Sequence, residues 1–483
     1  MSGDRSRAIK CFSIIGLSLF AYLLYLPTRT GLRAKTDEYR NLTGAIDILQ
    51  TGEFNGGYIS GHIYELLAGI LLRVFALNVP ATDWISPLIS AIPIFVISLV
   101  GGALIKQNKI DNWWVIFLYP LGILAVPEIF DGVRESSHKA FTYAISFLCL
   151  LIFYRVSNSS DGRYVLLAVI LSLTLVLLNY PWGGVYLTIT AISFIILNYS
   201  YRSFMRHSWL LLILVTTVTV VVYLPDIGYR HVILYIPSIV GGVVDVLLGN
   251  FAGSTPSPGS SEGLISLISE YHTITIAGIG INSWFIYSSG VFVTAILCMV
   301  SAIYATADVL SPFDTQKPHP LSILLMVTSV GYGFLLIAAV VSGTSVIVKR
   351  MVVWPVITGI YYWTVLVGSP TLATGWIARH RSQIAAISIA LLLISVPLAA
   401  ERYAPTRSDA AHHPHLSVEE EELAAFANEY IVSDVELSTG RTTVSNAIQK
   451  YYGKEVHSKP CRWDRNVIYS SKQGSCESQL QFH

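Results

Sequence analysis

Long apolar runs recur along the chain with short polar connections between them, the pattern of a protein that crosses a membrane many times. A spanning helix needs roughly 20 apolar residues, and that criterion predicts about eleven spans. They are expected at 9–27, 84–105, 113–130, 140–156, 164–180, 184–200, 208–225, 284–304, 321–342, 351–368 and 382–400.

An odd number of spans places the two termini on opposite sides of the membrane. The first run follows three basic residues, and Tyr25 to Arg29 offers no small-residue cleavage site, so we expect an uncleaved span with a cytoplasmic N-terminus. Short cytoplasmic loops should carry Lys and Arg. Each such loop does: Lys106 and Lys109, Arg155 and Arg163, Arg202 and Arg206, Lys317, and Arg379 and Arg381.

Three segments on the opposite, external side are long: 28–83, 226–283 and 401–483. In the first, Glu65 and Arg73 interrupt the apolar stretch from Ile63 to Leu77, which indicates an amphipathic helix on the membrane interface. The second contains a Gly-, Ser- and Pro-rich loop. The third mixes helix-like and strand-like pieces, including a short strand predicted at Val467–Tyr469.

The predicted fold is therefore an all-α polytopic membrane protein, with its N-terminus inside and its C-terminus outside. A transmembrane domain covers 1–400, and a small external α+β domain covers 401–483. Composition agrees, because 53% of the residues are hydrophobic and 13% are charged, against about 25% charged in soluble domains. The net charge of +1 gives no argument for nucleic-acid binding. Cys461 and Cys476 in the tail are open to either reading, a disulfide or free thiols.

The candidate chemistry begins just after the first span, at Thr36-Asp37-Glu38-Tyr39-Arg40. Asp37 and Glu38 have two readings. They are part of a solvated loop or an acidic cap for a helix that starts near Tyr39, or they belong to an active site. The second reading gains support because other ionisable groups are predicted at the same external face. These are His62, Glu65, Glu128, Asp131, Arg134, Glu135, His138, Lys139, Lys349 and Arg350.

Carboxylates and arginines at an outer membrane face suit a proton-abstracting transfer reaction with a lipid-phosphate substrate. A partly desolvated carboxylate such as Asp37 has a pKa raised toward neutrality and can serve as a general base. An arginine such as Arg350 grips a phosphate with two parallel hydrogen bonds, although snorkelling at the interface is its ordinary role. His138 has the blander reading of a polar residue at a helix start. Trp182, in a tight external turn, is either part of the aromatic belt or a platform for a sugar.

The order of these features resembles the GT-C class of integral-membrane glycosyltransferases. The likeness comprises a first span, the acidic pair, the stretch Ala45 to Phe54 and then an interfacial helix. The class includes protein O-mannosyltransferases, lipid A aminoarabinose transferases and the catalytic subunit of oligosaccharyltransferase. The Pro181-Trp182-Gly183-Gly184 turn is also similar to the oligosaccharyltransferase-like branch.

The resemblance implies roles for particular residues. Asp37 would be the catalytic carboxylate, with Glu38 and Arg40 beside it, and Glu135 a second acidic position. Arg350, with Lys349 and Arg134, would hold the phosphate of a polyprenyl or dolichyl donor. His138 and Trp182 would complete the substrate site. The acceptor would be a glycan, a lipid or a protein on the extracytoplasmic face of the cell membrane.

Two departures from the class narrow the expectation. The C-terminal half holds no Trp-Trp-Asp-type motif, and the second acidic position reads Arg134-Glu135-Ser136-Ser137 rather than Asp-x-Asp. We therefore expect a monophosphate-linked donor and no required cofactor. If the reaction is metal-dependent, Asp37 and Glu135 would hold Mg²⁺ or Mn²⁺. The alternatives are a multi-span transporter or lipid-linked sugar flippase, and a non-catalytic scaffold.

Overall fold

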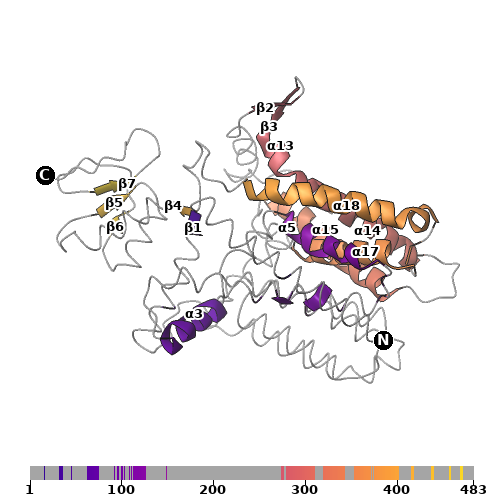
Figure 1. Cartoon of the computed structure of the whole chain (residues 1–483), viewed down its shortest axis with the longest axis horizontal. Coiled ribbons are helices and arrows are strands. Elements are labelled where there is room, and N and C mark those ends of the chain that lie inside the picture. The colour runs from indigo at the N-terminus through magenta and orange to yellow at the C-terminus, as the bar shows by residue number, and fades with distance from the viewer. Residues whose placement is uncertain are drawn as a thin grey trace.

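The computed structural model of the chain describes the helices and strands coloured in Figure 1. The described residues are 16, 32–35, 45, 62–75, 92, 95–96, 99–101, 103, 108, 110, 112–126, 148, 273–276, 279–310, 319–342, 353–370, 372–373, 375–401, 415–417, 437–439, 456–457 and 468–470.

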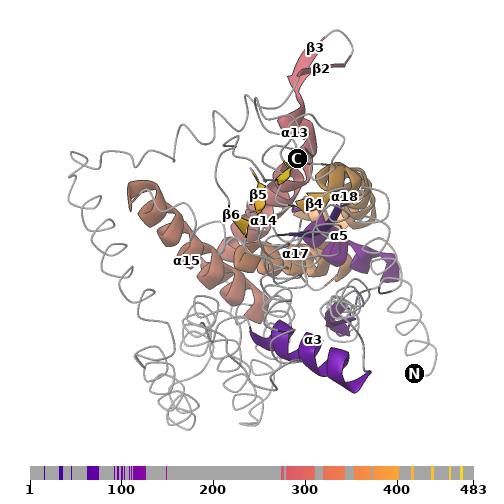
Figure 2. The same ribbon diagram turned by 90° about the vertical axis from the view of Figure 1, so that its left-hand side faces the viewer.

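A bundle of apolar helices forms the centre of the described structure. It consists of α14 (Ser289–Leu310), α15 (Pro320–Ser342), α17 (Val353–Gly368) and α18 (Gly375–Glu401), which pack together with the short helix α5 (Leu118–Leu124). The 3-10 turn η2 (Trp113–Phe117) leads into α5. Figures 1 and 2 show this bundle from two directions. The helices predicted at 321–342 and 351–368 are confirmed as α15 and α17.

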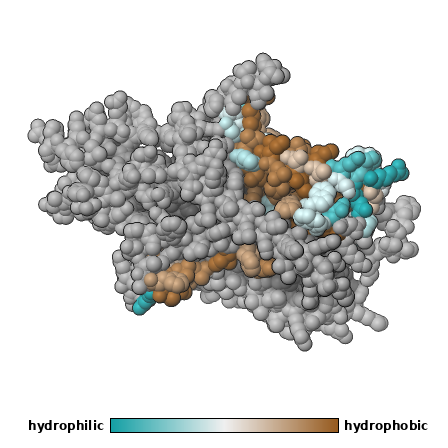
Figure 3. Space-filling view, viewed as in Figure 1, coloured by the Kyte–Doolittle hydropathy of each residue, from teal (hydrophilic) through white to brown (hydrophobic). Residues whose placement is uncertain are grey.

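Two of the described helices are long and apolar enough to cross a membrane, Ser289–Leu310 and Gly375–Ala399. Only 28% and 33% of their apolar windows are buried, so most of each helix faces outward. Ile296 and Ile303 of α14 are more than half exposed, as are Ile387 and Ile394 of α18. Figure 3 shows the apolar surface over the bundle. Such surfaces are costly in water and need no cover in lipid.

Three predicted boundaries are wrong by several residues. The span at 113–130 is a 3-10 turn followed by a helix that ends at Leu124, because Val126 precedes Pro127 and a residue before proline avoids the helical region. The span at 284–304 is split into α13 (Ser283–Tyr287) and α14, which continues to Leu310. The span at 382–400 starts earlier, at Gly375, and bends at His380.

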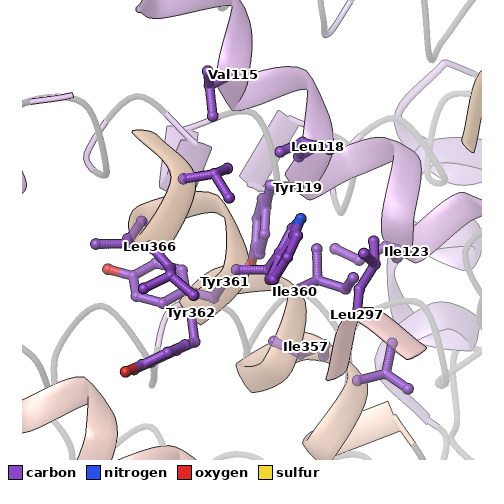
Figure 4. Packing of buried hydrophobic residues seen from close by; sticks show 14 of the residues in the cluster. Val115, Leu118, Tyr119, Ile123, Leu297, Ile357, Ile360, Tyr361, Tyr362 and Leu366 are labelled. Carbon is purple, nitrogen blue, oxygen red and sulfur yellow. The ribbon is translucent and has the colours of Figure 1, made fainter. Parts of the chain in front are cut away.

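The core of the bundle is built where α5, α14 and α17 approach closely (Figure 4). The rings of Tyr119 and Tyr361 meet edge to face with centroids 6.0 Å apart. Gly122 lies directly beneath Ile360, and a Cβ there would come within 2.8 Å of that side chain. Small residues at these crossings let helix backbones approach, as in membrane helix packing generally.

Helix α3 (His62–Val74) is found where the interfacial helix is predicted. Glu65 and Leu72 are buried against the protein, whereas Leu66, Ile70 and Val74 are exposed. The helix thus turns an apolar stripe outward, seen as the brown band at the lower left of Figure 3. This orientation is the one that an interfacial helix beside a membrane requires.

The described strands form three small sheets. β1 (Leu32–Lys35) pairs antiparallel with β4 (His415–Ser417), and β2 (Thr273–Ile276) forms a hairpin with β3 (Ile279–Asn282). The tail contains a three-stranded parallel sheet in the order β6-β5-β7, from β5 (Leu437–Thr439), β6 (Val456–His457) and β7 (Ile468–Ser470). β7 confirms the strand predicted at Val467–Tyr469.

Candidate functional site

Contacts between α5 and α17 show that these two helices run in opposite directions. Gly122 of α5 lies against Ile360, and Val115, in the preceding turn, lies near Gly368 at the other end of α17. The C-terminal end of α5 therefore lies at the same end of the bundle as the N-terminal end of α17.

The other helices fit the same frame. α14 begins against the end of α5, because a Cβ on Gly290 would overlap the carbonyl oxygen of Ala125, and the Thr294 hydroxyl donates to the Gly122 carbonyl at 3.3 Å. α15 runs antiparallel to α17. Its Ser322 hydroxyl donates to the Tyr362 hydroxyl at 3.3 Å, and the Thr328 and Thr358 hydroxyls lie 3.0 Å apart.

The bundle thus has two distinguishable ends. The first, which we call the acidic-loop end, is where α5 ends at Leu124 and where α14 and α17 begin, at Ser289 and Val353. The second, the basic-loop end, is where α14 ends at Leu310 and α17 ends at Gly368. Arg379 and Arg381 lie in the first turns of α18 at the basic-loop end, and Lys317 falls in the sequence between α14 and α15. The sequence pattern predicts all three in cytoplasmic loops.

The predicted site segments join the bundle at its acidic-loop end. The stretch with Arg134, Glu135 and His138 follows the end of α5, and Lys349 and Arg350 immediately precede α17. The chain therefore leaves and enters the bundle for both segments at one end. The predicted topology puts both segments at one external face, and the helix contacts are a separate observation that brings these helix ends together.

The acidic pair is tied to the same region through a sheet. β1 ends at Lys35, two residues before Asp37, and Lys35 lies opposite His415 in the register with β4. Figure 1 shows the β1–β4 pair beyond the end of the bundle that carries α13. The pairing also requires the first long loop and the C-terminal tail to lie on the same side of any membrane that the bundle spans.

The predicted site side chains themselves lie outside the described residues. This holds for Asp37, Glu38, Arg40, Arg134, Glu135, His138, Trp182, Lys349 and Arg350. Trp182 also lies within 149–272, a range in which the structure describes no residue, so no nearby helix end indicates its position. Among the described residues, no group of three His, Cys, Asp or Glu side chains could hold a metal ion. The assigned roles and the metal dependence stay predictions.

A polar cluster that the sequence reading missed lies at the acidic-loop end, at the junction of α13 and α14. We call Ser283, Trp284, Ser288 and Ser289 the junction cluster. Each has a buried side-chain hydroxyl or indole N–H that finds no hydrogen-bond partner in the described structure. Ser283 is 0% exposed and Ser288 is 3% exposed. Buried polar groups are nearly always paired, so four unpaired groups within seven residues call for an explanation.

Aromatic rings surround the junction cluster. Trp284 contacts Phe285 and Phe292 edge to face, and these two phenylalanines stack with centroids 6.3 Å apart. The Asn282 side chain caps α13 by accepting the Trp284 backbone N–H at 2.9 Å. In the sequence, Asn282 to Ser289 reads as an aromatic belt at the start of a span. The four Ser and Asn residues in this stretch were the sequence feature that could have indicated a polar cluster there.

The basic-loop end carries a different arrangement. The Asp308 carboxylate accepts the backbone N–H of His319 at 2.9 Å, and the His319 ring Nδ1 accepts the Leu321 N–H at 3.3 Å. Burial lowers the pKa of the His319 imidazole, and the Asp308 carboxylate opposes that shift. The ring bond needs an unprotonated Nδ1, so this arrangement favours neutral His319. It closes the connection between α14 and α15.

No protein-family model and no curated protein sequence matches this chain. Among solved structures, the chain is similar to the crystal structure of ArnT from Cupriavidus metallidurans in the apo state. The two are 11% identical, and the match covers 93% of this chain and 84% of ArnT with a TM-score of 0.42. A superposition at that score and identity gives no argument about fold or activity.

Proposed function

We propose that the chain is an integral-membrane glycosyltransferase that transfers a sugar from a polyprenyl or dolichyl monophosphate to a glycan, lipid or protein acceptor. One observation carries the proposal. The helix ends nearest in sequence to the two predicted segments, Leu124 of α5 and Val353 of α17, lie at one end of the bundle. β1, which ends two residues before Asp37, lies beyond that end. The resemblance of the first external loop to the GT-C class supplies the reaction type.

In the proposed reaction, the Asp37 carboxylate takes the proton of the acceptor hydroxyl as its oxygen bonds to the anomeric carbon. The bond from that carbon to the lipid phosphate breaks, and its electron pair leaves with the phosphate. Sugar transfer passes through an oxocarbenium-like state. Stabilisation of the departing phosphate by Arg350 and Lys349 is therefore as important as activation of the acceptor.

A transporter or flippase is the second candidate, and the described helices argue against it. Transporters place ionisable groups near the bilayer midplane. In α14, α15, α17 and α18, the Asp, Glu, Lys, Arg and His residues occur only near the helix ends, at Asp308, Arg379, His380, Arg381 and Glu401. The middle of each helix is apolar apart from hydroxyl groups, the Cys298 thiol and the Trp363 indole N–H.

The test is a transfer assay in nanodiscs with radiolabelled polyprenyl-phosphate sugars, with and without EDTA. We expect transfer by the wild type and a loss of at least about a hundredfold for Asp37→Asn and for Arg350→Ala, because each removes a group that acts in the transition state. Matched controls with the same chemical changes lie at the basic-loop end, Asp308→Asn and Arg379→Ala, and should remain active.

The possible outcomes test the enzyme class and the assignment of catalytic residues separately. Full activity of Asp37→Asn would show that the catalytic carboxylate is another residue. Equal losses in the controls and in the site variants would show that charge removal damages the fold. No transfer from any donor, with substrate flux in liposomes instead, would establish the transporter. The EDTA arm decides whether Mg²⁺ or Mn²⁺ takes part.

A further inference from the structure

The junction cluster stands where a long helix begins. The Ser288 carbonyl accepts the backbone N–H groups of Val291 and Phe292, at 3.0 and 3.3 Å, so Ser288 occupies the position that caps α14. A serine at a helix cap ordinarily accepts an N–H from the first turn through its hydroxyl. Here the residue Ser288 is 3% exposed, and its buried hydroxyl is one of the unpaired groups of the described structure.

The peptide dipoles of α14 contribute a partial positive charge at its start, where the Ala125 carbonyl oxygen at the end of α5 also lies, against Gly290. The first N–H groups of a helix have no carbonyl upstream in the same helix, and the aligned peptide dipoles add a partial positive charge at that point. The Ser288 and Ser289 hydroxyls and the Trp284 indole N–H are hydrogen-bond donors at the same place, and no carboxylate occurs among residues 279–307. Neutral donors at a helix start bind phosphate well.

An apolar stripe runs down α14 from this point. Phe292, Ile296, Met299 and Ile303 are 46%, 55%, 59% and 61% exposed, and their spacing puts them on one face of the helix. The backbone N–H of Phe292 donates to the Ser288 carbonyl, so the stripe begins one helical turn after the capping residue. α18 also exposes an apolar stripe, but none of the described residues of α18 has a buried side-chain donor without a partner.

We propose that the junction cluster binds the phosphate of the prenyl monophosphate carrier and that the α14 stripe receives its isoprenoid chain. The donors match a compact anion, and the stripe matches a long apolar tail attached to it. The choice of a prenyl carrier rests on the proposed function. The site adds Trp284, Ser288 and Ser289 to the basic residues predicted at the same end of the bundle.

The competing explanation is that the unpaired groups are incidental features of the core. Ser301 provides a matched comparison, because its hydroxyl is also buried and unpaired in the described structure, at 0% exposure. It lies on the same helix, about 18 Å further along the axis than Ser289. If the unpaired groups are incidental, replacing Ser288 or Ser301 by alanine should have the same effect on ligand binding. If the junction cluster binds phosphate, only the Ser288 replacement should weaken binding.

The experiment measures binding by the purified full chain in detergent, from the rise in thermal stability on adding ligand. The ligands are a prenyl monophosphate, the corresponding prenol, phosphatidic acid and inorganic phosphate. We expect the prenyl monophosphate to bind most tightly. Ser288→Ala and Trp284→Phe should weaken its binding about ten- to a hundredfold, the effect of losing one hydrogen bond to a charged group. Ser301→Ala should bind like the wild type.

A second pair of variants tests the stripe. Met299→Gln places a polar group on the α14 stripe and should weaken binding of the prenyl monophosphate without changing that of inorganic phosphate. Ile387→Gln makes an equally polar change on the exposed face of α18 and should leave both unchanged. Each variant must first match the wild type in ligand-free stability. We expect this for Ser288→Ala, since it removes a hydroxyl that has no partner in the described structure.

Each result is decisive. No stabilisation of the wild type by the prenyl monophosphate, equal binding by Ser288→Ala, or equal weakening by Ser301→Ala would overturn the inference. Tighter binding of phosphatidic acid would show that the site holds a bilayer lipid instead. Sugar transfer is a separate readout. If the wild type transfers sugar but the Ser288 and Trp284 variants bind the prenyl monophosphate as the wild type does, this site is refuted and the proposed function stands. If those variants lose binding but the wild type transfers no sugar, the proposed function alone is refuted.

Discussion

The contact between Gly290 and Ala125 gives the sharpest prediction about the bundle. A Cβ at position 290 would overlap the Ala125 carbonyl oxygen and lie 2.9 Å from its carbon, whereas ordinary contact begins at 3.4 Å. The obstacle is backbone, which cannot rotate away, so α5 and α14 would have to separate by at least about 0.5 Å to restore an ordinary carbon contact. Gly333 offers the matched position, because nothing lies within 4 Å of a Cβ built there.

The two substitutions should therefore act in opposite directions. Overpacking typically costs about 1–3 kcal/mol, so Gly290→Ala should destabilise the chain by about that amount. Gly333→Ala adds a methyl group in open space and improves helix propensity, so it should be neutral or stabilising by up to about 1 kcal/mol. The measurement is the free energy of unfolding in mixed micelles as the denaturing detergent fraction rises.

The same pair connects packing with activity. Gly290 sets the position of Ala125, after which the chain continues toward Arg134 and Glu135, so Gly290→Ala should also lower transfer per folded molecule. Gly333→Ala should not. Equal stability for the two variants would refute the described approach of α5 and α14. A destabilised Gly290→Ala protein with undiminished transfer would refute the link between that contact and the site.

Two further predictions concern other contacts. The pKa of His319 is lowered by burial, so the unfolded chain binds its proton more readily. Stability should then be fully present above about pH 6.5, the unfolded value, and fall as the pH drops below it, and thermal unfolding at several pH values should show a weaker decline for His319→Gln. The Thr328 and Thr358 hydroxyls lie 3.0 Å apart. A double-mutant cycle with valine should give a coupling of about 0.6 kcal/mol, and additive losses would contradict the bond.

The hydrophobic pattern located the described helices of the bundle because each is fixed by local composition. α15 and α17 begin and end within two residues of their predicted limits. The errors arise where local composition is ambiguous. Arg379 and Arg381 were interpreted as loop residues, yet they lie in the first turns of α18, where long basic side chains are tolerated at a helix end.

Long-range contacts were beyond the reach of sequence pattern. Nothing in the apolar runs indicates that Gly290 meets Ala125 or that Lys35 lies opposite His415. The junction cluster was also missed, since Trp284 and its serines have the composition of an interfacial belt. Whether such residues pair or stay unpaired is decided by neighbours distant in the chain. The helix contacts therefore come from the structure, whereas the common face of the site segments and the chemistry assigned to them are predictions from the sequence.

The pairing of β1 with β4 has a consequence for biosynthesis. Leu32 and Ser417 are partners 385 positions apart (417 − 32), so nearly the whole chain must be made before the strand next to Asp37 has its neighbour. On the proposed topology, the last span must be inserted and the tail exported before that small sheet can close. A ribosome product released before β4 would carry every span but leave β1 unpaired. Maturation of the acidic loop is thereby coupled to completion of the polypeptide.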